Sequence, residues 1–109
     1  MVEKSIVNDV RNYLLRLAEQ GIEISFGIVF GSYASGHAHQ WSDIDLVVVS
    51  PQFDKTITRE NINTLWRIAA RTDSRIEPIP CGKRQWENNT SSEIIEIARN
   101  EGTPVYLDK

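Results

Sequence analysis

Two aspartates stand at the beginning of an apolar segment, and they limit what this chain can fold into more than any other feature. Residues 43–49 read DIDLVVV, and Ser50-Pro51 ends the segment. Its length and its apolar run are typical of a β-strand, in which aspartate is disfavoured. Because side chains alternate along a strand, we expect Asp43 and Asp45 on one face, about 6.5–7 Å apart along the chain.

Two carboxylates at this spacing repel each other unless a cation lies between them. Hard cations prefer oxygen ligands, and Mg²⁺ in particular is usually held by one or two carboxylates together with substrate phosphates. A polar strand start, whose carboxylates cap nearby backbone amides, explains the same pattern without a metal ion. The pair of aspartates alone therefore leaves both interpretations open.

Hydrophobic periodicity predicts the elements around this strand. We expect helices over 3–20, 59–71 and 91–101, one or two helical turns after Ser32, and strands over 24–30, 43–49, 75–80 and 103–107. This alternation indicates an α/β (α+β) fold, in which a small mixed β-sheet packs against helices. A chain of 109 residues has room for one core, so we expect a single domain over 1–109.

Particular residues mark the ends and faces of these elements. Thr58 is expected to cap the helix over 59–71, and Trp66 is expected on the buried face of that helix. Thr90 and Glu93 have the spacing of a capping box at the start of the last helix. Two prolines in RIEPIP, residues 75–80, place this strand at an edge of the sheet or end it early.

Composition excludes several classes of function. With 12 Lys and Arg against 15 Asp and Glu, the net charge of -3 argues against broad binding of nucleic acid, which needs a basic face. No segment is apolar enough for a signal sequence or a membrane span. Cys81 is the only cysteine, so no internal disulfide can form. We expect its side chain to be buried, in a protein of the reducing cytoplasm.

The dipeptide Gly31-Ser32 changes the interpretation of the two aspartates. It directly follows the first expected strand and begins the short helical turn. Glycine lets a backbone approach a ligand closely, and the amides at a helix start donate hydrogen bonds to an anion, as does the serine hydroxyl. A phosphate site beside a metal site is the minimum equipment for nucleotidyl transfer, which depends on positioning and on charge stabilisation.

The arrangement of these residues resembles a known family. Gly31-Ser32, followed after ten residues by Asp-Ile-Asp at 43–45, is similar to the signature of the DNA polymerase β-like nucleotidyltransferase superfamily. The longer string GSYASGHAHQWSDIDLVVVS resembles the minimal nucleotidyltransferase branch, with Gly36 and Ser42 in their usual places. The resemblance extends over almost the whole chain, because EIIEIARNEGTPVY is similar to the closing helix, glycine and strand of that branch.

The resemblance implies roles for three carboxylates. Asp43 and Asp45 would bind two Mg²⁺ ions when nucleotide is present, and Glu77 on the third strand would complete the set. Glu77 would also help to deprotonate the acceptor hydroxyl. A solvated strand residue that pairs with Arg75 is the alternative interpretation of Glu77.

The resemblance also implies that Gly31, Ser32 and Ser42 bind the nucleoside triphosphate. Relatives in this branch often carry basic residues between the Gly-Ser pair and the next glycine, where this chain has Tyr33 and Ser35. One cationic contact to the pyrophosphate is therefore missing, unless a distant basic residue replaces it. Lys83 and Arg84 are the candidates that the sequence offers.

The acceptor of the nucleotide is inferred from resemblance alone. Minimal nucleotidyltransferases are often paired with a helical HEPN protein, as the antitoxin half of a toxin–antitoxin system, and can adenylylate that toxin, typically at a tyrosine. We therefore predict transfer of AMP from ATP to a HEPN-type protein partner. Two alternatives stay open. One is a small-molecule nucleotidyltransferase that acts as a homo-oligomer, namely a dimer with the acceptor pocket at the subunit interface. The other is a non-catalytic antitoxin that neutralises its partner by contact.

Overall fold

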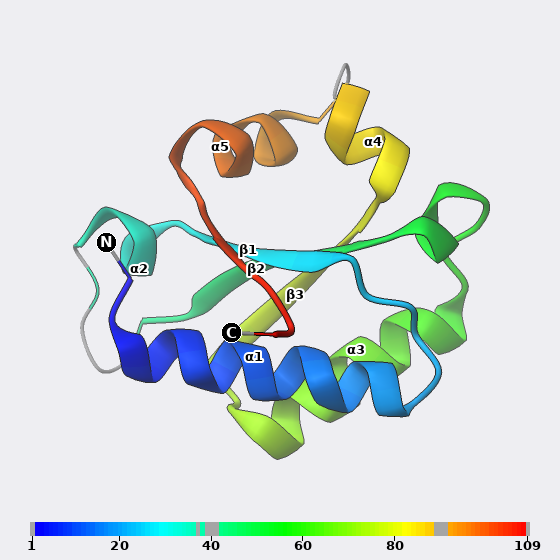
Figure 1. The fold of residues 1–109 in the computed structure, drawn as a ribbon, viewed down its shortest axis with the longest axis horizontal. Helices are drawn as coiled ribbons and strands as arrows, with labels where there is room; N and C mark the ends of the chain where they lie inside the picture. Colours follow the sequence, from blue (N-terminus) through cyan, green and yellow to red (C-terminus); the bar gives the residue numbers. More distant parts are fainter. Residues whose placement is uncertain (1, 37, 39–41, 89–91, 109) are drawn as a thin grey trace.

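The computed structural model describes residues 2–36, 38, 42–88 and 92–108 (Figure 1). Its helices are α1 (Lys4–Glu19), α2 (Ser32–Ser35), α3 (Arg59–Thr72), α4 (Lys83–Asn88) and α5 (Glu93–Glu101). Its strands are β1 (Phe26–Phe30), β2 (Ile44–Ser50), β3 (Ile76–Gly82) and β4 (Thr103–Val105), and a 3₁₀ turn, η1, spans Pro51–Asp54. The predicted order of helices and strands is confirmed, with α4 and η1 as additions.

The strands form one mixed sheet in the order β3-β2-β1-β4. Strand β1 is antiparallel to both β2 and β4, whereas β2 and β3 are parallel because α3 returns the chain to the other end of the sheet. The two prolines of β3, Pro78 and Pro80, lie in an edge strand as expected, where a missing amide donor is tolerated. The mixed sheet of the predicted fold class is thus confirmed.

The two faces of the sheet build separate apolar cores. Helices α1 and α3 cover one face, and α4 and α5 lie over the other (Figure 1). Alternation divides β2 between the cores: Leu46 and Val48 face α1 and α3, and Val47 and Val49 face α5. Asp45 therefore belongs to the face that α4 and α5 cover.

Two of the predicted helix caps have different outcomes. The Thr58 side chain accepts a hydrogen bond from the Asn61 amide at 3.0 Å, which confirms this residue as the cap of α3. Helix α5 begins later than expected, and Ser92 caps it by accepting from the Ile95 amide at 3.4 Å. Thr90, the cap expected from the sequence, lies outside the described residues.

The prediction for Trp66 was wrong, because this side chain is 48% exposed. Helix α3 buries Leu65, Ile68 and Ala69 against the sheet and α1. Successive residues of a helix are about 100° apart, so Trp66 lies beside this face rather than within it. Ile62, on the same side as Trp66, is also exposed.

Helix α4 was not predicted, since KRQWEN has no apolar periodicity and its residues are exposed or half-buried. Its start is stabilised by a residue from η1: the Arg84 amide donates to the two carboxylate oxygens of Asp54 at 3.0 and 3.2 Å. Cys81, just before this helix, is fully buried as expected. Among the helices of the described residues, none has both the length and the apolar character needed to cross a membrane.

Candidate active site

Asp43 and Asp45 lie at the beginning of β2, beside α2, which contacts both β1 and β2. Asp43 is exposed and Asp45 is half-buried. Between them Ile44 is fully buried, and its amide donates to the Arg75 carbonyl oxygen at 2.7 Å. This buried residue anchors the backbone, so that the flanking aspartates point away from the core under α1 and α3.

Glu77 is the direct neighbour of Asp45 across the parallel pair β2–β3. Residues paired in this way point to the same side of a sheet, so Glu77 also belongs to the face of Asp45. The structure does not support a pair between Glu77 and Arg75, because the Arg75 guanidinium forms ion pairs with Asp73 and Asp9. The register thus brings together the three carboxylates that the sequence singled out.

The carboxylates influence one another's protonation. Burial raises the pKa of Asp45, and the charge of Asp43 raises it further, while a hydrogen bond with Glu77 lowers it. Burial likewise raises the pKa of Glu77, followed by the charges of Asp43 and Asp45. Clustered acids of this kind favour either a proton or a cation between them.

Gly31 joins β1 to α2 and lies against the Asp45 carboxylate. Its φ of 75° and ψ of −147° are nearly exclusive to glycine. A Cβ atom at this position would overlap the Oδ2 atom of Asp45. The sequence indicated Gly31 as a site residue, and the structure adds a reason: only glycine leaves space for this carboxylate.

The two serines that the sequence indicated lie in the segments next to the carboxylates. Ser32 is the first residue of α2 and Ser42 immediately precedes Asp43, and both are half-buried. Helix α2 has only four residues, so any phosphate contact would come from local amides and hydroxyls rather than from a helix macrodipole. Lys83 follows the far end of β3, about 20 Å along the strand from Glu77, and is too distant to replace a missing basic residue.

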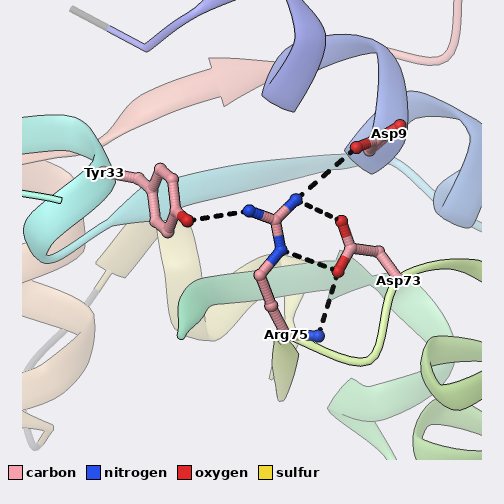
Figure 2. Close-up of polar contacts among 4 residues, drawn as sticks. All are labelled: Asp9, Tyr33, Asp73 and Arg75. Atoms are coloured by element: carbon pink, nitrogen blue, oxygen red, sulfur yellow. Dashed lines mark hydrogen bonds and ion pairs between the residues drawn. The ribbon is translucent and has the colours of Figure 1, made fainter. Parts of the chain in front are cut away.

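Sequence reasoning missed a polar network that lies behind α2, next to the candidate site. Tyr33 on α2 accepts a hydrogen bond from Arg75 Nη1 at 2.9 Å, and Asp73 holds the rest of the guanidinium (Figure 2). Tyr33 packs against the core under α1 and α3, so the network lies on the side of the sheet opposite Asp45. The only sequence signal was Asp73 two residues before Arg75, a spacing typical of an Asx turn.

The donor set fits Mg²⁺ bound together with a nucleotide. Within the described residues, no three His, Cys, Asp or Glu side chains converge closely enough to enclose a metal ion by themselves. Mg²⁺ seldom occupies a cage made only of protein ligands, since phosphates and waters complete its octahedron. Asp43, Asp45 and Glu77 offer hard oxygen ligands close to one another, and the Asp45 carboxylate occupies the space that Gly31 leaves without a Cβ atom.

Comparison with known proteins gives the family. A family model for the nucleotidyltransferase domain matches residues 8–100, which include all of these carboxylates. The chain belongs to this nucleotidyltransferase family. The match confirms the resemblance seen in the Gly-Ser and Asp-x-Asp motifs, and no curated protein matches the chain with significance.

Solved structures share the fold of this nucleotidyltransferase domain. A toxin–antitoxin complex with AMP-PNP is 21% identical, with a TM-score of 0.61 over 88% of this chain and 72% of that one. A putative nucleotidyltransferase from Sulfolobus solfataricus is 13% identical, with a TM-score of 0.65 over 90% and 77%. A mutant of the toxin–antitoxin pair MntA–HpeT is 18% identical, with a TM-score of 0.60 over 88% and 71%.

Proposed function

We propose that this chain is a metal-dependent nucleotidyltransferase that transfers AMP from ATP to a hydroxyl group of a HEPN-type toxin, and that it acts as the antitoxin. The observation that carries the proposal is the register of β2 and β3, which places Glu77 beside Asp45 on one face of the sheet. Three carboxylates gathered at the end of β1, beside Gly31-Ser32, are suited to a metal–nucleotide complex.

In this proposal Asp43, Asp45 and Glu77 hold two Mg²⁺ ions. The ions would supply charge stabilisation for the attacking and leaving oxygens during in-line displacement at the α-phosphorus. The Asp45 carboxylate is held by its position in β2 and by a hydrogen bond with Glu77, so the site is partly ordered before the nucleotide binds. Pre-set ligands lower the cost of ordering the site when the nucleotide arrives.

Gly31, Ser32 and Ser42 bind the triphosphate. The Ser32 hydroxyl is a donor for phosphate oxygens, and the absence of a Cβ on Gly31 lets this turn lie directly against the Asp45 carboxylate. The acceptor oxygen forms a bond to the α-phosphorus as the bond to the β-phosphate oxygen breaks, and pyrophosphate leaves. Glu77 accepts the proton of the acceptor hydroxyl.

The choice of nucleotide and acceptor draws on relatives with the same fold. One toxin–antitoxin neighbour contains AMP-PNP, an analogue of ATP. In the MntA–HpeT neighbour, two aspartates that are two positions apart were changed to glutamate, a spacing equal to that of Asp43 and Asp45. Both neighbours are toxin–antitoxin proteins, which favours a protein acceptor over a small molecule.

A labelling experiment tests this function. The protein is incubated with ATP labelled at the α-phosphate and Mg²⁺, with and without a HEPN-type protein, and we expect label on the HEPN protein. The double variant Asp43→Asn/Asp45→Asn should lose labelling, whereas Glu19→Gln, an exposed acid at the end of α1, should retain it. Transfer by the double variant would contradict the assignment of these carboxylates.

The same experiment separates the two alternative functions. Label on a small acceptor but not on the protein, together with a homo-oligomer in solution, would indicate a small-molecule nucleotidyltransferase. Tight binding of the HEPN protein without any labelling would indicate an antitoxin that acts by contact. Either result would overturn the proposed protein acceptor.

A further inference from the structure

Arg75 connects three parts of the chain at the end of the sheet that carries the carboxylates. Its Nε and Nη2 atoms donate to the two oxygens of Asp73 at 3.0 and 2.6 Å, in the bidentate geometry that guanidinium favours. Its Nη1 atom donates to the Tyr33 hydroxyl at 2.9 Å, and Nη2 lies 3.8 Å from Asp9 on α1 (Figure 2). One side chain thus joins α1, α2 and the segment before β3.

The backbone of Arg75 is fixed on both sides. Its amide donates to Asp73 Oδ1 at 3.0 Å, so Asp73 holds the main chain and the side chain together. Its carbonyl oxygen accepts from the Ile44 amide at 2.7 Å, between the two aspartates of β2. Glu77 follows two residues later on the same backbone. Arg75 is therefore directly connected to the strand starts that carry all three carboxylates.

Tyr33 links this network to α2, because its hydroxyl accepts the hydrogen bond from Arg75 Nη1. It is adjacent to Ser32, and its ring centroid lies 5.7 Å from the Arg75 guanidinium carbon, within the range of a cation–π contact. A helix of four residues is not stable by itself, because nucleation costs more than so few hydrogen bonds return. Tertiary contacts must therefore decide where α2 lies, and the hydrogen bond from the Arg75 guanidinium to Tyr33 is one of these contacts.

We propose that Arg75 is a positioning residue, which through Tyr33 holds α2 and Ser32 at a fixed place relative to Asp43, Asp45 and Glu77. The inference rests on the proposed function in so far as Ser32 faces the nucleotide. The network lies beneath α2, on the side of α1, so Arg75 acts through Tyr33 and does not contact the substrate.

Steady-state kinetics test this proposal with two mild variants. Tyr33→Phe removes only the hydroxyl, and Arg75→Lys keeps the charge but loses the planar fork. In both we expect the KM for ATP to rise about tenfold, the effect of one charge-assisted hydrogen bond, with a much smaller change in kcat. A purely structural role would lower the active fraction, and hence kcat, at unchanged KM, and that result would overturn the proposal.

A matched arginine controls for general loosening of the fold. Arg11 donates from Nε to the Tyr106 carbonyl oxygen at 2.9 Å and joins α1 to the segment after β4, away from the carboxylates. Arg11→Gln should leave the KM for ATP unchanged. An equal rise in KM for Arg11→Gln and Arg75→Lys would mean that any loss of an inter-element contact has this effect, and would contradict the specific role of Arg75.

Hydrogen exchange gives a readout that does not require catalysis. The Ala34 amide donates to the Gly31 carbonyl oxygen at 3.1 Å and reports whether the turn of α2 is closed. Tyr33→Phe should speed its exchange by about tenfold, while Arg11→Gln should not. Unchanged exchange in Tyr33→Phe refutes the proposal. If the wild type transfers no nucleotide, the proposed function fails, yet the exchange rates still decide whether Arg75 orders α2.

Discussion

Replacing Gly31 by alanine tests the contact on which the site depends. Two effects combine at this position. The φ of 75° with ψ of −147° lies in a region that is nearly exclusive to glycine, and such strain costs about 1–3 kcal/mol. The new Cβ atom would also overlap Asp45 Oδ2, but this atom is the end of a side chain that can rotate away. Strain therefore sets the loss of stability, and the rotation of Asp45 sets the loss of activity.

The expected magnitudes follow from these two effects. For a domain of about this size, 1–3 kcal/mol corresponds to a fall in melting temperature of roughly 4–12 °C. A displacement of a catalytic group by about 1 Å can lower the rate by roughly a hundredfold, so transfer should fall by at least this factor in the folded protein. Thermal melts followed by circular dichroism measure the first quantity, and labelled-ATP transfer well below the melting temperature measures the second.

Gly21 provides the matched control for this substitution. It also has a positive φ, 92°, but a Cβ atom there would meet nothing within 4 Å. Gly21→Ala should lower the stability by about 1–2 kcal/mol and leave the transfer rate unchanged. If Gly31→Ala instead keeps the activity of Gly21→Ala at a similar melting temperature, the contact with Asp45 has no part in the site and the reasoning is wrong.

Three further predictions concern charge and burial. Burial and a neighbouring carboxylate raise the pKa of Asp45 in the folded state, so its ionised form destabilises the fold as pH rises. Asp45→Asn should therefore have a higher melting temperature than wild type at pH 7 without metal. A lower melting temperature would contradict this. The hydrogen bond with Arg75 is the main reason why the pKa of Asp73 is lowered, so the contribution of Asp73 to stability is present above about pH 4 and is lost as pH falls. The free energies of unfolding of Asp73→Asn and wild type, measured by urea titration, should therefore converge in acid. Tyr13 is fully buried, and its hydroxyl donates to the Leu65 carbonyl oxygen at 2.8 Å. Tyr13→Phe should therefore lower the free energy of unfolding, measured by urea titration, by about 1–1.5 kcal/mol. An unchanged value would show that this hydrogen bond contributes nothing.

Most of the helices and strands could be predicted because their patterns repeat within one element. The apolar spacing of α1 and the alternation along β1 report which face each element buries, whatever its neighbours are. The errors occurred where burial depends on a neighbour. Trp66 fits an apolar helical face in the sequence, yet α1 and the sheet cover the adjacent face of α3. Helix α4 has no apolar face, and its start depends on Asp54 from a separate turn.

The sequence by itself determined the local part of the candidate site. It placed Asp43 and Asp45 two residues apart at a strand start, and Gly31-Ser32 after the preceding strand. Alternation and the conformational freedom of glycine are properties of the nearest residues, so they can be read without a fold. The spacing of these motifs also indicated the nucleotidyltransferase family, which the family match confirmed.

Only the tertiary structure decided how distant residues meet this local arrangement. The parallel register pairs Asp45 with Glu77, and a shift by one residue would turn Glu77 to the opposite face. The fold also brings Tyr33 within 2.9 Å of Arg75, although they are 42 positions apart. Such contacts depend on the path of the chain between the two positions and on the packing of α1 and α3, which no short pattern encodes.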